Sequence, residues 1–478
     1  MPIANGRTRM SILPVPRPAN ESPMHIPDRI TLTTYLGRWT ADYGMFLVLV
    51  LLAAFFSVAT WNEQQPQGAD AARQLAQRIL DRPEPARRVL VLGQTGGQAR
   101  RFVEALETRL AEEGIDVAAA RSGSPAELRR VLEEAAAAGR PIDVIAATHE
   151  VARWPILENV SERFQLAGQA AIISPRSYYL PDFLKLSNLM AIADRIVVIA
   201  LIAIGMTMVI ITAGIDLSVG SLIAFSAVLA TLLMRDYAGA REAAPLAVVL
   251  CCLAAIAACA LIGVFSGAMV TFFSIPPFIV TLAMMLVARG LAFTLDGGKT
   301  IYQVPENFIW LGRGADLFGI PNTVVLMAVL YLAAYVLMSR TVLGRYIYAV
   351  GGNPEAARLS GVPVRRVLLF VYGTCAALAG LGGIVQASQL RSGAPTYGMM
   401  YELYVIAAVV VGGTSLAGGH GKVIGTLIGA FIIAVIQNGM NLTGVEPYTQ
   451  NVVLGLLILA AVLLDMLKRK GTALFRRR

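Results

Sequence analysis

Charged residues, histidine and cysteine are scarce in this chain, and their scarcity excludes several classes of protein. Only 15% of its 478 residues are charged, against 56% that are hydrophobic, and the mean hydropathy is +0.63. This balance excludes an ordinary soluble enzyme. The 3 histidines, His25, His149 and His420, lie far apart in the sequence, so no metal-site pattern is present.

The 4 cysteines all lie inside apolar runs, at Cys251, Cys252, Cys259 and Cys375. None stands in a segment that we expect to be an external loop, where a disulfide would form. We therefore interpret them as small packing residues, and neither as disulfide partners nor as metal ligands.

A phosphate-binding loop is also missing. Residues 297–300 read GGKT, but the pattern GxxxxGK[ST] requires glycine at position 293, where the chain has Phe293. The segment also follows a predicted membrane helix rather than a strand. We expect no bound cofactor and no catalytic residue in this chain, so any ATP hydrolysis that serves it must occur on another polypeptide.

Long apolar runs are abundant. About 20 consecutive apolar residues suffice to cross a bilayer, and such a segment must be helical because its backbone groups find no water to bind. The runs predict an α-helical polytopic membrane protein with about ten transmembrane helices and a small inserted α/β domain. The predicted spans are 43–61, 190–213, 217–234, 245–271, 278–295, 322–339, 367–386, 402–417, 422–442 and 449–467.

The distribution of basic residues predicts the topology. Lysine and arginine number 40 against 31 acidic residues, and a basic tail, residues 468–478, follows the last span. By the positive-inside rule this tail is cytoplasmic. An even number of spans then places the N-terminal tail, residues 1–42, on the same side. We interpret the basic excess as a determinant of topology, and we expect no nucleic-acid partner.

Residues 62–182 differ in kind from the apolar runs around them. Strands are predicted over residues 88–92, 116–120 and 142–146, and helices over 70–80, 98–113 and 125–138, an alternation typical of a small parallel α/β domain. The segment has 17 acidic and 15 basic residues, so it has no cytoplasmic bias. One span precedes it, so we expect it on the external side, in the periplasm.

A glycine-rich turn lies within this inserted segment. Residues 93–97, GQTGG, follow the first predicted strand and open a helix, whose N–H groups could hold an anion. The alternative interpretation, an ordinary turn between strand and helix, is the more common case.

Two polar interruptions break the apolar pattern of the membrane region. Residues 205–221 contain Asp216 and Ser218, and a buried acid at this depth is costly unless it is paired or wet. A break between helices, at which Asp216 or Ser218 caps the next span, is one interpretation; direct contact with a transported solute is the other. The second interruption is at Pro277, which suits the first position of a helix because proline has no backbone N–H to donate. Pro277, Phe278 and Thr281 are candidates for the helix break or for contact with a transported solute.

The stretch 401–442 combines polar residues with many glycines. Glu402 and Asn438 are candidate pathway residues. Gly421, Gly425 and Gly429 recur every fourth residue, which is a packing device for helices in lipid. They could serve packing within one chain or an interface between two copies, and the sequence favours neither.

The most informative segment is the polar loop between the spans at 322–339 and 367–386. Its arginines are Arg340, Arg345, Arg358, Arg365 and Arg366, which makes it cytoplasmic by the positive-inside rule. Its centre predicts a short helix, with asparagine at the N-cap, proline next, an acid in the first turn and glycine at the end. A helix held between two membrane spans can be pushed by a partner. This helix and its ends comprise Gly352, Asn353, Pro354, Glu355, Ala356, Ala357, Arg358, Leu359, Ser360 and Gly361.

Four of these segments resemble the permeases of ribose-, xylose- and galactose-type ABC importers, in the branched-chain permease superfamily. They are GIDLSVGS at 214–221, PPFIVTL at 276–282, the glycine-rich stretch 401–442 and the basic loop 344–366. The resemblance covers residues 183–467 nearly throughout. In that family the first span is followed closely by a segment such as FLKLSNL, which here begins only at Phe183, after about 120 inserted residues.

The resemblance implies a function and partners. The chain would form the translocation pathway for a monosaccharide or similar small polar solute in a bacterial inner membrane, by alternating access. A separate ATPase, which binds ATP-Mg, would dock on residues 352–361, which the resemblance makes the candidate coupling segment. A periplasmic solute-binding protein would deliver the solute, and a second permease subunit, identical or related, would complete the pathway. The inserted segment loosely resembles half of a periplasmic sugar-binding protein, and we hypothesise that it docks the binding protein or guards the entrance.

Two other functions compete with this interpretation. An ion-coupled secondary transporter of a small solute would have ionisable residues at mid-membrane and related halves, and the sequence has no convincing internal repeat. A sensor with an external α/β domain would need a recognisable cytoplasmic output domain, and neither tail contains one.

Overall fold

The computed structural model describes residues 32–165 and 169–475. They divide into one compact unit that ends at Gly44 and a second that begins at Met45. The second unit contains all the elements discussed below, including helix α1 (Leu32–Ala59) from Met45 onward. Most of the predicted N-terminal tail lies outside the described residues. The predicted C-terminal tail begins inside a helix that continues to Phe475.

Every predicted span coincides with a helix. Seven helices are long and apolar enough to cross a membrane within the described chain, and three shorter apolar segments, Gly44–Ala59, Tyr401–Val411 and Pro447–Leu463, join them. The prediction of a polytopic helical membrane protein is confirmed. After α1 the helices concerned are α6 (Leu186–Ile211), α7 (Val219–Tyr237), α8 (Pro245–Phe272), α9 (Pro277–Leu295), α11 (Asn322–Arg340), α14 (Val364–Leu390), α15 (Tyr401–Val411), α16 (Val423–Leu442) and α17 (Pro447–Phe475).

The span predicted over residues 402–417 is shorter than expected. Helix α15 has 11 residues. At about 1.5 Å per residue it is too short to cross a hydrocarbon core of about 30 Å. It ends at Gly412 because Gly413 has a φ of +87°, in the left-handed region that a glycine adopts without strain.

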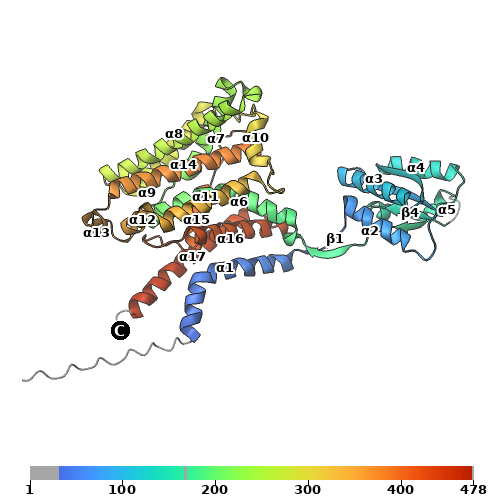
Figure 1. Ribbon diagram of the computed structural model, residues 1–478, viewed down its shortest axis with the longest axis horizontal. Coiled ribbons are helices and arrows are strands. Elements are labelled where there is room, and N and C mark those ends of the chain that lie inside the picture. Colours follow the sequence, from blue (N-terminus) through green and yellow to red (C-terminus); the bar gives the residue numbers. More distant parts are fainter. Residues whose placement is uncertain (1–31, 166–168, 476–478) are drawn as a thin grey trace, which may run out of the picture. The chain divides into compact units, whose positions relative to one another are not determined.

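Helix α6 forms the centre of the membrane region. Its most apolar 18-residue window is 89% buried, whereas the corresponding windows of α8, α9 and α11 are 22–28% buried. Helix α14 packs against α6, α7 and α8 (Figure 1). The outer helices expose large apolar side chains, as helices in contact with lipid do.

Small residues allow the helices to approach closely. A Cβ atom on Gly263 of α8 would lie 2.4 Å from the carbonyl oxygen of Tyr372 in α14. On Gly429 of α16 it would lie 2.0 Å from the carbonyl oxygen of Ala408 in α15, and on Gly425 it would lie 2.3 Å from that of Gly412. Gly425 and Gly429 therefore serve packing within one chain, which was one of the two interpretations of their spacing.

The inserted α/β domain has a four-stranded sheet in the order β3-β2-β4-β5, and all its strands are parallel. Alternate residues of the central strand β2 face opposite sides. Val89 and Val91 pack in a core with α2 and α3, and Leu90 and Leu92 in a second core with α4. The elements are α2 (Gly68–Leu80), β2 (Arg88–Gln94), α3 (Gly97–Glu112), β3 (Asp116–Gly123), α4 (Pro125–Ala137), β4 (Val144–Ala147), α5 (Val160–Arg163) and β5 (Ala171–Ile173).

The three predicted strands and three predicted helices of this domain are confirmed, and the remaining elements were not predicted. Most important is a two-stranded antiparallel ribbon of β1 (Trp61–Gln64) and β6 (Tyr178–Pro181), in which Gln64 pairs with Tyr178. The other short elements are η1 (Val151–Arg153), η2 (Asp182–Leu184), η3 (Ala240–Glu242), α10 (Glu306–Arg313), α12 (Val342–Gly352) and α13 (Pro354–Leu359).

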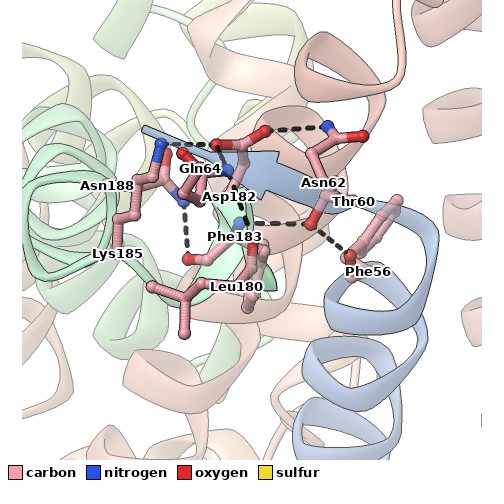
Figure 2. Close-up of polar contacts among 9 residues, drawn as sticks. All are labelled: Phe56, Thr60, Asn62, Gln64, Leu180, Asp182, Phe183, Lys185 and Asn188. Carbon is pink, nitrogen blue, oxygen red and sulfur yellow. Dashed lines mark hydrogen bonds and ion pairs between the residues drawn. The ribbon is translucent and has the colours of Figure 1, made fainter. Parts of the chain in front are cut away.

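Polar contacts around Asp182 close the base of this ribbon (Figure 2). The Asp182 carboxylate accepts hydrogen bonds of 2.9 Å from the amides of Asn62 and Gln64, and Lys185 lies 2.6 Å from it. These donors, Asn62 first, hold the pKa of the Asp182 carboxyl below its ordinary value. The Thr60 hydroxyl accepts the N–H of Phe183 and donates to the carbonyl of Phe56.

Apolar contacts support the same junction. Phe56 stacks on Phe183 with 6.2 Å between ring centroids, and both rings are buried. A Cβ atom on Gly439 of α16 would lie 2.2 Å from the Phe56 ring, so this ring occupies the space that the glycine leaves. The chain therefore leaves α1 and enters α6 through one packed and hydrogen-bonded junction.

Replacing Asp182 by alanine should loosen the ribbon. The variant loses three polar contacts of a partly exposed carboxylate, and we expect the free energy of local opening to fall by about 1–2 kcal/mol. Limited proteolysis within residues 61–67 and 174–181 of the full chain would measure this opening. The stabilisation should also be lost as the pH falls below the ordinary aspartate pKa of 3.8, because the folded-state pKa is lower.

Asp70→Ala provides the control, because Asp70 makes only an exposed ion pair with Arg73 and should change the opening by less than about 0.5 kcal/mol. Equal cleavage rates for the two variants would contradict the role of Asp182.

Candidate coupling and pathway site

The short helix expected in the basic loop is present as α13. The Asn353 side chain accepts hydrogen bonds of 3.0 Å from the N–H groups of Glu355 and Ala356, so it caps the helix. Pro354 occupies the first helical position. At the other end, Gly361 has a φ of +83°, and the N–H of Val362 binds the carbonyl of Ala357. The predicted start and end of this helix are confirmed.

One ion pair lies on the surface of α13. Arg358 contacts the Glu355 carboxylate at 2.6 Å, and this contact holds the pKa of the Glu355 carboxyl below its ordinary range. Both side chains are exposed, so the pair contributes little to stability. Its charges remain available to a partner.

Almost the whole of the candidate coupling segment is exposed. Ala357 alone is buried, at 6% exposure, while Leu359 is 77% exposed. The other exposed members are Gly352, Asn353, Pro354, Glu355, Ala356, Arg358, Ser360 and Gly361. An exposed leucine beside charged side chains on a rigid helix is typical of a protein–protein contact.

The segment in front of α13 is firmly attached to the membrane helices. A Cβ atom on Gly351 would lie 1.7 Å from the carbonyl oxygen of Ile211, the last residue of α6, and 2.7 Å from the N–H nitrogen of Gly419. That same Ile211 carbonyl accepts a hydrogen bond of 2.9 Å from Gly419. Tyr348 donates to the carbonyl of Gly421. Displacement of α13 would therefore act on the end of α6 and on the turn 412–421.

The break between α6 and α7 begins at this same end of α6. Ala213 has a φ of +62°, and residues 212–218 are not helical. The Asp216 carboxylate is fully buried and accepts hydrogen bonds from both the N–H (2.9 Å) and the hydroxyl (2.6 Å) of Ser218. Asp216 therefore stabilises the break itself. Ser218 is the N-cap residue of α7, but its hydroxyl donates to Asp216 instead of accepting from the helix.

Helix α9 is fastened to this break. Pro277 begins α9, and the Thr281 hydroxyl lies 3.1 Å from the carbonyl oxygen of Ile215. Thr281 is fully buried, whereas Phe278 is 53% exposed. Among the predicted pathway residues, Asp216, Ser218 and Thr281 therefore meet at one place, and Phe278 lies on the exposed side of α9.

Glu402 lies against the first turn of α7. A Cβ atom on Gly220 would lie 2.1 Å from Oε2 of Glu402, so the glycine makes room for the carboxylate. This oxygen is buried and has no hydrogen-bond partner among the described residues. Arg289 of α9 donates to the carbonyls of Pro395 and Tyr397, in the segment that precedes α15.

Asn438 belongs to a different contact. Its amide exchanges hydrogen bonds of 2.9 and 3.1 Å with the amide of Asn188, and Asn188 also donates to the carbonyl of Phe183 (Figure 2 shows the latter bond). Asn438 thus joins α16 to the start of α6, next to the junction of the inserted domain. The structure does not bring it together with Asp216 or Glu402.

Tyr372, which the sequence analysis did not single out, and Cys375, which it interpreted as a packing residue, lie near the break. The Tyr372 hydroxyl lies where a side chain on Gly214 would be, at 2.4 Å from an added Cβ, and has no hydrogen-bond partner within the described chain. Cys375 packs against Gly205 of α6. Both lie on α14 in an apolar run, and such a run contains no signal of a polar neighbour far earlier in the chain, between α6 and α7. No group of three or more potential metal ligands occurs in the described residues.

The fold and this site define a polytopic membrane protein with a break between its central helices and a short, capped and exposed helix between two of its spans. Residues 188–462 match the family model described as the permease component of branched-chain amino acid transport systems, and the chain belongs to this family. It is therefore a transport subunit. The inserted α/β domain precedes the matched residues.

Individual relatives cover the same part of the chain. The ribose import permease protein RbsC of Escherichia coli (strain K12) is 43% identical over 312 residues, which are 64% of this chain and 94% of the relative. RbsC of Bacillus subtilis (strain 168) is 42% identical over 60% of this chain and 87% of its own. The galactose/methyl galactoside import permease protein MglC of Haemophilus influenzae (strain ATCC 51907 / DSM 11121 / KW20 / Rd) is 34% identical over 60% and 89%. No solved structure matches the chain.

Gly351→Ala should disrupt the connection between α13 and α6. The added methyl group would overlap the Ile211 carbonyl oxygen, and we expect a loss of about 2–3 kcal/mol of stability or a displaced α12. Thermal unfolding in detergent and solute uptake by reconstituted vesicles would measure both effects.

Gly455→Ala in α17 is the matched control, because a Cβ atom there meets nothing within 4 Å, the residue is exposed and it lies outside the coupling segment. If Gly351→Ala unfolds and transports like Gly455→Ala, the close contact with Ile211 does not transmit motion.

Proposed function

We propose that this chain forms the translocation pathway of an ABC importer for a monosaccharide, and that an ATPase subunit drives it through α13. The observation that supports the proposal most directly is the exposed, rigidly capped helix whose base contacts the end of α6. The relatives named as ribose and galactose import permeases support the class of solute.

The proposed mechanism follows the contacts from α13 inward. Closure of the ATPase subunits displaces α13, and the contact between Gly351 and Ile211 passes this displacement to the break at residues 212–218. Asp216, Ser218 and Thr281 join α7 and α9 at that break, so both helices respond together. Access to the pathway then alternates between the two sides of the membrane.

The partners and topology complete the proposal. The chain lies in a bacterial inner membrane with both termini in the cytoplasm, and the inserted domain, residues 62–182, is periplasmic. A periplasmic solute-binding protein delivers the sugar, and a second permease subunit, identical or related, completes the pathway. ATP-Mg is bound by the ATPase, and this chain binds no cofactor for the transport step.

Leu359→Asp tests the docking helix. Leu359 is 77% exposed, so the change should leave the fold intact while it removes the apolar centre of the contact. We expect affinity for the ATPase to fall about thirtyfold, the loss of about 2 kcal/mol typical of an interface hot spot. Co-purification and binding measurements in detergent would show the loss.

Phe318→Asp serves as the control, because Phe318 is even more exposed, at 95%. It precedes α11, whereas α12 and α13 follow the other end of that helix, so the change lies away from the docking helix. Solute uptake that needs no ATPase and follows an ion gradient would overturn the proposal in favour of a secondary transporter.

Removing the inserted domain tests its proposed role in docking the binding protein. Because Gln64 pairs with Tyr178, residues 65–177 can be replaced by Asn-Gly, which closes β1 and β6 as a hairpin. We expect the half-saturating concentration of loaded binding protein to rise about tenfold, or about 1.4 kcal/mol, in vesicle uptake. Unchanged affinity and rate would contradict a docking role.

A further inference from the structure

The inserted domain contains a cavity of about 270 Å³ that the transport function does not use. It lies at the carboxyl ends of β2 and β4, where Gln94 and Thr148 form part of its wall and are hydrogen-bonded to each other. The rest of the wall comes from the first turns of α2 and α3 and from His149 and Glu150. All these elements belong to the one domain.

The topology of the sheet favours a ligand site at this place. In the strand order β3-β2-β4-β5, the chain passes from β2 to β3 on one side of it, and then crosses back to form β4 on the other side of β2. In open parallel sheets the crevice outside the carboxyl ends of the strands at such a reversal is the usual ligand site. The cavity lies at this reversal.

Two helix starts supply hydrogen-bond donors to the cavity. The N-cap residues Gln67 of α2 and Gly96 of α3 make no side-chain cap hydrogen bond in the described structure, so the first N–H groups of both helices are left without a side-chain acceptor. Helix α4, which does not line the cavity, has a complete capping box of Ser124 and Glu127. Cβ atoms added to Gly96 or Gly97 would meet nothing within 4 Å, so the space beside these two glycines is open.

His149 is a second, independent indication of a ligand. Both of its ring nitrogens are buried, and neither has a hydrogen-bond partner among the residues described. An imidazole always has at least one N–H to donate, and a buried donor without an acceptor is costly. A ligand in the cavity that accepts from His149 would remove this cost.

The charges at the cavity define the class of ligand. The helix starts present the positive ends of two dipoles, which attract an anionic group. Neither lysine nor arginine is among the described residues that line the cavity, and Glu150 contributes the one carboxyl group among them. This balance suits a single phosphate or carboxylate group better than a polyphosphate. The volume is near the lower end of ligand pockets, so the ligand is small.

We propose that the inserted domain binds a small organic anion, with its phosphate or carboxylate at the start of α3 and a hydrogen bond from His149. Amide and hydroxyl side chains of Gln94, Gln98 and Thr95 contact its polar body. This site is separate from the translocation pathway and does not depend on the proposed transport function. The anion is a ligand of the domain, while the transported solute is taken to be a neutral sugar.

Isothermal titration calorimetry on the full chain in nanodiscs, without partner proteins, tests the site. D-ribose 5-phosphate is compared with D-ribose, and D-gluconate with D-glucose, so each pair differs in the anionic group. We expect binding of the phosphate ester, the carboxylate, or both, and none of the neutral sugars. The two anionic probes distinguish a phosphate site from a carboxylate site. Neutral sugars that bind as tightly would overturn the anionic class, and failure of all the probes would overturn the site.

Gly97→Glu places a built-in carboxylate at the start of α3, in open space and where an acid favours the helix. It should retain or raise the melting temperature and weaken anion binding at least about tenfold. Ala126→Glu puts the same charge in the first turn of α4, outside the cavity, and should leave binding unchanged. Equal effects of the two variants would overturn the assignment.

His149→Leu and His149→Gln separate packing from hydrogen bonding. The leucine variant should weaken anion binding about tenfold, and the glutamine variant, which keeps a donor, should restore most of it. If both variants bind like the unchanged chain, His149 does not contact the ligand.

Discussion

The membrane region depends on one constraint, the need to satisfy backbone groups where the chain stops being helical inside an apolar environment. Between α6 and α7 this need is met locally. Asp216 accepts from Ser218, Thr281 contacts the carbonyl of Ile215, and Gly419 donates to the carbonyl of Ile211. Each bond comes from a different part of the chain, so the break joins α7, α9 and the turn 412–421 into one structural unit.

This unit connects the interior of the membrane region to its exposed helix. Gly351 packs directly on the Ile211 carbonyl, and α13 follows only a few residues later. The repulsion energy of such a glycine contact rises sharply with a small displacement, because no flexible side chain lies between the two backbones. A small displacement of α13 therefore has to be accommodated at the break. Near it lie Oδ2 of Asp216, the hydroxyl of Tyr372 and Oε2 of Glu402, which are buried and have no hydrogen-bond partner within the described residues.

The inserted domain is joined to the membrane region through a two-stranded ribbon. The β1–β6 ribbon brings its two ends together, and Asp182, Thr60 and the stacked Phe56 and Phe183 close the junction. A domain inserted between paired strands adds little strain to the rest of the protein, because the two strands pair as they would in a simple hairpin. A family that matches from residue 188 can therefore accept about 120 additional residues before it.

The sequence by itself determined the elements whose signals are local. Apolar runs predicted the membrane helices, the strand–helix alternation predicted the inserted domain, and Asn353, Pro354 and Gly361 predicted the ends of α13. Tertiary structure alone decided the rest. The Asn188–Asn438 pair, the β1–β6 ribbon and the place of Tyr372 beside the break all join residues remote in sequence. Helix signals repeat every few residues along the chain, whereas contacts between distant segments depend on how complete surfaces pack, and no short pattern contains that information.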